Sequence, residues 1–190
     1  RRPVSTAYDL VMRPVLTPKQ MRVLDTETIT AGTPIEILVG RAGAAVARAA
    51  KRMMGGLYGR TVVVITGKGN NGADGRVTAR LLADQGVRVH VIDAEHMPLR
   101  LPVSDLIIDA AFGTGFRDDW SPPSTQGVPV LAVDIPSGID ATTGECRGIP
   151  FIAQRTVTFG ALKPGIVRAG AAIGPHTGPK GLGVALIRAK

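Results

Sequence analysis

The sequence predicts a three-layer α/β protein whose central sheet is mainly parallel and doubly wound. Two observations carry this prediction. Short apolar runs rich in β-branched residues recur along the chain, which is typical of strands buried on both faces of a parallel sheet. The first run, T-V-V-V-I at 61–65, is followed by a glycine-rich loop, a helical pattern and a second strand, which together make one βαβ unit.

Length and composition indicate one domain with a sizeable core: the chain has 190 residues, of which 44% are hydrophobic. Residues 1–16 show no clear period and are predicted to form an N-terminal arm, while residues 17–190 form a single domain. The one cysteine, Cys146, excludes an intrachain disulfide and fits a reducing compartment, so we expect a cytoplasmic location. No apolar run reaches the roughly 18 residues of a membrane span.

The net charge of +8 is compatible with a nucleic-acid partner or with a small anionic ligand. Lys and Arg are spread along the chain instead of forming a cluster. Four Phe, two Tyr and one Trp supply few stacking platforms for single strands. We therefore favour a small anionic ligand over nucleic acid.

Two helices are predicted before the first strand. Thr17, Pro18 and Gln20 form the start signal of a helix that runs to about residue 30. The pair Thr33-Pro34 repeats that signal, and apolar residues then continue at helical spacing as far as Met53, before two glycines.

After the strand at 61–65 we expect a helix at 75–85 and further strands at 87–92, 105–109, 128–134, 156–159 and 184–187. Parallel strands are usually joined by a dozen or more residues that include a helix. The connections after residues 92 and 112 contain prolines and no helical pattern, so two crossovers lack their helices. One sheet face would then be bare, and we predict that another subunit, another domain or the arm covers it. The first of these options makes the protein a homodimer.

Polar, glycine-containing segments follow four of the predicted strands. They read G-K-G-N-N-G-A-D-G (67–75), D-A-A-F-G-T-G (109–115), D-I-P-S-G-I-D (134–140) and F-G-A-L-K-P-G (159–165). Because ligands of parallel sheets bind beyond the carboxyl ends of the strands, we expect these segments to share one rim. The first segment suits a phosphate at a helix start, although its spacing is not that of a Walker A loop.

Oxygen-bearing side chains are concentrated in these segments. Asp109 and Asp134 each lie at a strand end, and Asn70, Asn71 and Ser137 lie on adjacent loops. Such ligands suit Mg²⁺, Ca²⁺ or an alkali cation and argue against zinc. No Ser-His-Asp triad can be assembled from the sequence.

The four segments, in this order, resemble the motifs of the YjeF N-terminal family, the NAD(P)H-hydrate epimerases. The segments L-T-P-K-Q-M-R-V-L-D (16–25) and L-V-G-R-A-G (38–43) are also similar, so the resemblance covers about residues 16–188. It implies a Rossmann-like fold and an isomerase that interconverts the R and S hydrates of NADH and NADPH. It further implies a bound potassium ion and a companion dehydratase, often fused in bacteria.

Carried over by motif, the resemblance implies roles for particular residues. The potassium ligands would be Asn71, Asp109 and Ser137. The hydrated nucleotide would contact Asn70, Asn71, Gly72, Ala73, Asp74, Gly113, Thr114, Gly115, Phe116, Arg117, Asp118, Asp119 and Asp134. Because the substrate hydroxyl must leave and return, a side chain has to shuttle a proton. We expect Asp134 in that acid–base role and Lys163 in charge stabilisation.

Three residues depart from the family pattern. Ala73 stands where glycine is usual, Lys68 where proline is frequent and Arg76 where an apolar residue is common. If position 73 needs a positive φ, a methyl group there costs about 1 kcal/mol or more. Together with the shortened crossovers, these departures leave an alternative open. The chain would then be a diverged homologue, either recruited to another substrate or serving as a non-catalytic binding or dimerisation module.

Overall fold

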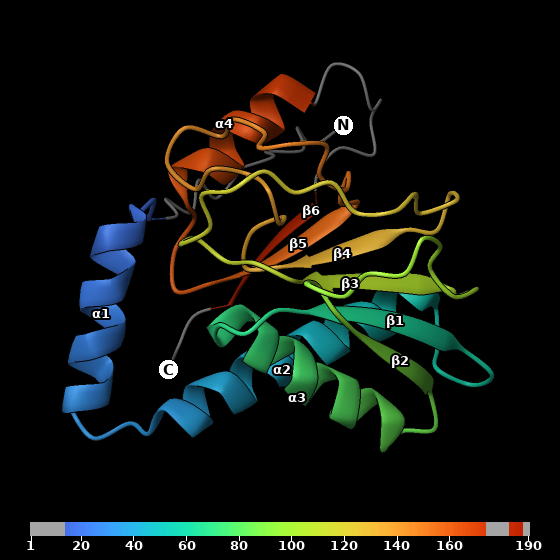
Figure 1. Ribbon diagram of the computed structural model, residues 1–190. Helices are drawn as coiled ribbons and strands as arrows, with labels where there is room; N and C mark the ends of the chain where they lie inside the picture. Colours follow the sequence, from blue (N-terminus) through green and yellow to red (C-terminus); the bar gives the residue numbers. More distant parts are fainter. Residues whose placement is uncertain (1–13, 174–182, 188–190) are drawn as a thin grey trace, which may run out of the picture.

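The computed structural model describes residues 14–173 and 183–187, and it contains one six-stranded sheet (Figure 1). The strand order is β2-β1-β3-β4-β5-β6, and every neighbouring pair is parallel. The predicted α/β class with a parallel sheet is therefore confirmed. The strands are β1 (Thr61–Thr66), β2 (Arg88–Asp93), β3 (Leu106–Ala110), β4 (Val130–Val133), β5 (Arg155–Phe159) and β6 (Gly183–Ile187).

Both early helices form close to where the sequence predicts them, but only the first has the predicted side-chain cap. The N-cap of the second helix is Pro34, not Thr33, and no side chain caps it. In α1 (Pro18–Thr30), the Thr17 hydroxyl accepts a hydrogen bond from the Gln20 N–H at 3.3 Å, and the Gln20 carboxamide accepts one from the Thr17 N–H at 2.9 Å. The second helix, α2 (Ile35–Met54), ends at Gly55, whose φ of 68° is the left-handed conformation that terminates helices.

Helices α2 and α3 (Asn70–Ala83) cover one face of the sheet, below it in Figure 1. The small side chains of α2 allow close packing, and Ala45, Val46 and Ala49 are almost fully buried. They share one apolar cluster with alternate residues of β1, β3 and β4, such as Val62, Val64 and Leu131. This layer fixes the position of the first turn of α3, which borders the site described below.

Two crossovers lack helices, as predicted, but the sheet face that they would cover is not bare. The segments that join β2 to β3 and β3 to β4 run over this face as irregular chain (Figure 1). Their side chains, including Leu101 and Trp120, form one apolar cluster with the sheet residues Val63 and Ile107, which are fully buried. The expectation of a bare face that another subunit, another domain or the arm must cover is therefore wrong, because the chain's own crossovers cover it. The bare face was the physical reason for predicting a homodimer, and the structure does not provide that reason.

Two helices differ from the sequence-based expectation. Helix α3 begins at Asn70, not at residue 75, so most of the predicted glycine loop is helical. Helix α4 (Pro164–Ile173) was not expected at all, although Pro164 at its first position is a usual start signal. Glycine-rich sequence has low helix propensity, and here tertiary packing overrides it.

The segment before α1 is pinned to the chain that follows β5. Val15 pairs with Leu162, and the Leu16 N–H donates to the Leu162 carbonyl at 2.8 Å. Residues 1–13 of the predicted arm lie outside the described residues. None of the helices formed by the described residues combines the length and apolarity needed to cross a membrane.

Candidate active site

A cleft of about 570 Å³ lies at the carboxyl ends of β1, β3, β4 and β5, where the sequence predicts a ligand site. Residues that follow these strands form one wall, among them Asn71, Phe112 and Asp134. The opposite wall comes from α1 and the start of α2, with Met21 and Asp25 among its residues. Helix α1 stands apart from the sheet, at the left of Figure 1, so the cleft separates it from the strand ends.

The glycine segment is a closely packed strand-to-helix turn. A Cβ atom on Gly67 would lie 2.0 Å from the carbonyl oxygen of Ala111, and one on Gly72 would lie 1.8 Å from that of Gly67. These glycines therefore let α3 start directly against the ends of β1 and β3. No side chain caps α3, whose N-cap is Gly69, so its first N–H groups can receive an anion.

Ala73 lies in the first turn of α3, where its N–H donates to the Gly69 carbonyl at 3.1 Å. Its φ is not positive, since Gln126 and Asp134 are the only described non-glycine residues with a positive φ. The alanine therefore adds no backbone strain. Asn70, Asn71 and Asp74 line the cleft, whereas Gly72 and Ala73 do not.

The other two departures from the family pattern have partners within the chain. The guanidinium of Arg76 donates to the Gly67 carbonyl at 2.9 Å and so ties α3 to the glycine segment. Lys68 forms an ion pair of 2.6 Å with Glu95, and both residues line the cleft.

Asp109 is fully buried behind the cleft wall, and hydrogen bonds hold its carboxylate. Oδ1 accepts from the Ser137 hydroxyl at 2.6 Å, and Oδ2 accepts from the Ser137 N–H at 2.8 Å. Burial raises the pKa of Asp109 to about 6, against the opposing effect of the hydrogen bonds from Ser137 and Ala111. The Ser137 oxygen also accepts from the Phe112 N–H at 2.9 Å, which links this pair to the cleft.

Asn71 completes an oxygen-rich cluster with these residues. Its amide nitrogen donates to the Phe112 carbonyl at 3.0 Å, while its buried Oδ1 has no hydrogen-bond partner. A buried, unpaired carbonyl oxygen is costly unless a donor or a cation satisfies it. The structure thus brings together Asn71, Asp109 and Ser137, the three predicted potassium ligands. Within the described ranges, no group of three or more His, Cys, Asp or Glu side chains is placed to hold a metal ion.

Asp134 and Lys163 form an ion pair in the cleft. Lys163 is 1% exposed, and its ammonium donates to Asp134 Oδ1, to the Thr158 hydroxyl at 2.8 Å and to the Phe159 carbonyl at 3.1 Å. All three ammonium protons are therefore used. Asp134 has a φ of 63°, in the left-handed region, so the end of β4 turns sharply at this residue. Strained backbone of this kind is frequent at functional sites.

Two more carboxyl groups line the same cleft: Asp74 lies on α3, on the wall of the strand ends, and Asp25 lies on α1, on the opposite wall. Burial, then the charges of Asp134 and Asp25, raise the pKa of Asp74 to about 8. Partial burial and the charge of Asp134 also raise the pKa of Asp25, against the lowering effect of Lys163. Sequence reasoning assigned no role to Asp25. Its only signal was its place at the end of the segment 16–25, which resembles the family.

The segment after β3 divides into two parts. Gly113, Thr114, Gly115 and Phe116 line the cleft. Arg117, Asp118 and Asp119 are exposed and do not line it. The ring of Phe116 stacks on Phe112 with 4.0 Å between centroids, so this wall is partly aromatic.

Comparison with known proteins agrees with this arrangement. The model of the family described as "YjeF-related protein N-terminus" matches residues 35–100 and 93–165. A protein from Leuconostoc mesenteroides named NAD(P)H-hydrate epimerase is 38% identical, over 83% of this chain and 85% of its own length. A protein from Thermofilum pendens named bifunctional NAD(P)H-hydrate repair enzyme Nnr is 33% identical, over 77% of this chain and 35% of its own length.

A solved structure shows the same fold. The crystal structure of the yeast protein YNL200c aligns with a TM-score of 0.68 and 25% identity, over 81% of this chain and 83% of the yeast chain. The family match extends over more than half of the chain, and the Leuconostoc protein is similar along most of its length. The chain therefore belongs to the YjeF N-terminal family.

Proposed function

We propose that this protein is an NAD(P)H-hydrate epimerase, an isomerase that interconverts the R and S hydrates of NADH and NADPH. The observation that carries the proposal is the Asp134–Lys163 ion pair, which shares one cleft with Asp74. A paired carboxylate and a carboxyl of raised pKa provide a base and an acid within one site. The names of the similar proteins from Leuconostoc and Thermofilum support the same substrate class.

The chemistry follows from the substrate carbon, which carries a hydroxyl next to a ring nitrogen. A proton given to the hydroxyl lets the C–O bond break, so that water leaves and the nitrogen lone pair forms a C=N⁺ bond. Water then adds to the opposite face and loses one proton, which restores neutrality with inverted configuration. Below a pH of about 8, Asp74 holds the proton that the first step needs. Asp134 accepts the proton in the second step, while Lys163 balances its charge.

The nucleotide part of the substrate is bound by the rim of the cleft. The uncapped start of α3, with Asn70 and Asn71, suits a phosphate group, because N–H groups and the helix dipole both favour an anion there. Thr114 and Phe116 form the adjoining wall. The net charge of +8 favours such an anionic substrate at long range.

A potassium ion fits the residues beside the cleft. We propose that Asn71, Asp109 and Ser137 hold it, because the unpaired Oδ1 of Asn71 needs a partner and the other two supply oxygen ligands. The ion would supply a fixed positive charge near the anionic substrate.

The partner and location predictions are part of the same proposal. Relatives named bifunctional repair enzymes support a companion dehydratase activity, fused or separate. The free cysteine Cys146 is compatible with the cytoplasm. A homodimer stays a prediction that light scattering of the purified chain tests.

One assay tests the activity. Equilibrated R and S hydrates of NADPH are mixed with a dehydratase that acts only on the S form, and consumption of the R form is followed with and without this protein. We expect the R form to disappear faster than spontaneous epimerisation allows. Folded protein that gives no acceleration in potassium buffer would contradict the proposal and favour a recruited or non-catalytic homologue.

A further inference from the structure

The cleft wall at 113–116 follows β3 on a crossover that lacks a helix, so its position must be fixed by other contacts. One set is aromatic: Trp120 packs edge-on against Phe112 and Phe151, with 5.5 Å between the centroids of each pair. A second set joins this segment to the chain around Arg147, which lies between β4 and β5. The Trp120 N–H donates to the Arg147 carbonyl at 3.1 Å.

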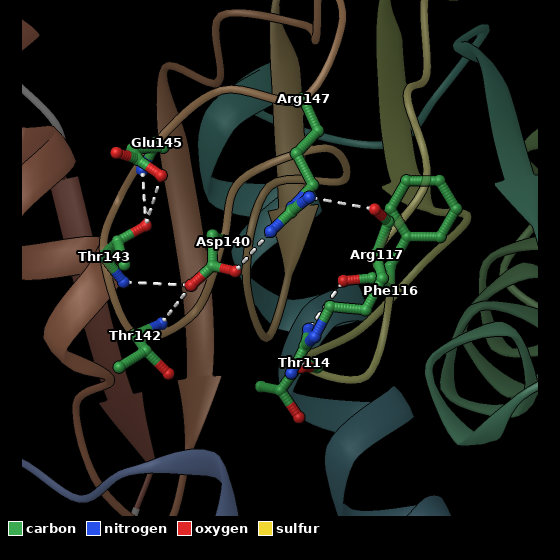
Figure 2. A network of polar contacts seen from close by, with 8 residues as sticks. All are labelled: Thr114, Phe116, Arg117, Asp140, Thr142, Thr143, Glu145 and Arg147. Atoms are coloured by element: carbon green, nitrogen blue, oxygen red, sulfur yellow. Dashed lines mark hydrogen bonds and ion pairs between the residues drawn. The ribbon is translucent and has the colours of Figure 1, made fainter.

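Figure 2 shows the guanidinium of Arg147 between two groups from separate segments. One terminal nitrogen donates to the Arg117 carbonyl at 3.0 Å, and the other donates to Asp140 Oδ2 at 3.2 Å. Arg147 thus connects the segment after β3 to the segment after β4. A guanidinium suits this connection, because its planar donors reach two acceptors at once.

Asp140 is a fixed anchor for this connection. Its Oδ1 accepts from the N–H groups of Thr142 and Thr143, both at 2.9 Å, and the residue is 7% exposed. These hydrogen bonds and Arg147 lower the pKa of Asp140 to about 2, so the carboxylate stays charged at neutral pH.

The connection made by Arg147 continues through Arg117 to the cleft wall. The side chain of Arg117 folds back and donates to the carbonyl of Thr114 at 3.0 Å and to that of Phe116 at 2.6 Å (Figure 2). The Phe116 N–H donates to the Gly113 carbonyl at 3.2 Å, which closes a turn. The segment 113–117 is therefore one small hydrogen-bonded unit, and Arg147 holds it from outside the cleft.

We propose that Arg147 is a positioning residue: by joining Asp140 to the Arg117 carbonyl, it sets the cleft wall formed by Thr114 and Phe116. It takes over the anchoring that a helix in this crossover would supply. The proposal rests on the proposed function only for its kinetic readout. It predicts weaker substrate binding without Arg147. While Arg147 is present, the wall is already ordered when the substrate arrives; without it, part of the binding free energy is used to order the wall.

The test compares Arg147→Met and Arg147→Lys with a matched control, Arg168→Met. Arg147 is half-buried and Arg168 is exposed, and Arg168 donates to a carbonyl of the same region, that of Thr142 at 3.0 Å, instead of to the segment 113–117. Backbone hydrogen exchange is measured by mass spectrometry over 113–121 without any ligand. The KM and kcat for the R hydrate of NADPH are then measured for each variant.

For Arg147→Met we expect exchange over 113–121 to accelerate about tenfold, and KM to rise about tenfold with kcat changed less than about twofold. Arg147→Lys should lie between this variant and the wild type, because an ammonium reaches one acceptor instead of two. Arg168→Met should match the wild type in both measurements. Unchanged exchange and KM in Arg147→Met, or equal effects in Arg168→Met, would overturn the proposal. If the wild type has no epimerase activity, the exchange comparison alone decides it.

Discussion

The ammonium of Lys163 donates a hydrogen bond to Oδ1 of Asp134, and this ion pair joins the turn after β4 to the residue before α4. Lys163 is almost fully buried, while the Asp134 side chain is 19% exposed toward the cleft. Asp134 therefore has two roles: it is available to a substrate, and it neutralises a buried cation. A substitution that removes the carboxylate affects both roles at once.

This double role determines what Asp134→Ala should do. We expect loss of epimerase activity together with a destabilisation of about 2–4 kcal/mol, because the substitution leaves the Lys163 ammonium buried without its counter-charge. Alanine is also less suited than aspartate to a φ of 63°. Asp134→Asn should lose activity with a smaller decrease in Tm, since asparagine tolerates this backbone and still accepts a hydrogen bond. Thermal unfolding and the hydrate assay measure the two effects separately, and an active Asp134→Asn variant would refute the acid–base role.

Asp74 should limit activity at alkaline pH. As an acid of pKa about 8 it is protonated below that pH, so activity should fall as the pH rises through about 8. Asp74→Asn should be nearly inactive at every pH. A rate profile from pH 6 to 10 checks this, and a profile flat through pH 8–9 would rule out Asp74 as the acid.

The same substitution should stabilise the fold. A carboxyl whose pKa is raised in the folded state opposes folding once the pH exceeds its ordinary value of about 4, and this penalty grows until the pH reaches the raised pKa. We therefore expect the free energy of unfolding of Asp74→Asn at pH 8 to exceed that of the wild type by about 1 kcal/mol or more. The variant should accordingly have the higher Tm at this pH. The difference in Tm between the variant and the wild type should decrease toward pH 4. A difference that does not change with pH would contradict this account.

Asp25 tunes Asp74 from the opposite wall of the cleft. Its negative charge helps to raise the pKa of Asp74, so Asp25→Asn should move the alkaline limit of activity to lower pH. Glu27→Gln is the matched control, because Glu27 is exposed on the same helix and does not line the cleft. A pH–rate profile that shifts equally in both variants would point to a general surface-charge effect.

Potassium should stabilise the protein if the cluster around Asn71 binds it. We expect Tm to rise with potassium concentration more than with sodium, because an ion that binds only the folded state shifts the unfolding equilibrium. Asn71→Ala should abolish the difference, since it removes the unpaired Oδ1. Asn70→Ala, a neighbouring exposed asparagine, should keep it. Equal stabilisation of all three proteins would indicate an unspecific salt effect.

Much of the fold was predictable because its signals are local. The β-branched run of β1 and the capping box at Thr17 both specify their elements without help from distant residues. The start of α3 was not predictable in this way. Residues 70–75 contain two glycines and two asparagines, which disfavour a helix, yet Gly72 and Gly75 are needed for contact with Gly67 and Ala110.

The site was predictable in its strand-end residues and not in its second wall. Asp109 lies at the carboxyl end of β3, and Asp134 and Ser137 follow β4, so topology alone brings them together. Asp25 lies on α1, and no local pattern shows that this helix lies across the cleft. The burial of Lys163 was equally hidden, because a lysine in a glycine-containing loop is usually solvated.

The layer of irregular chain over β1, β3 and β4 gives the two sides of the sheet unequal cooperativity. Helices α2 and α3 carry their own ladders of hydrogen bonds, whereas the opposite layer depends on aromatic contacts such as that of Trp120 with Phe151 and on scattered polar contacts. Segments of this kind open with a smaller free energy than the global unfolding of a domain. Warming should therefore release the wall at 113–116 first, so that the protein stops capturing its substrate at a temperature where the sheet and its two helices are still intact.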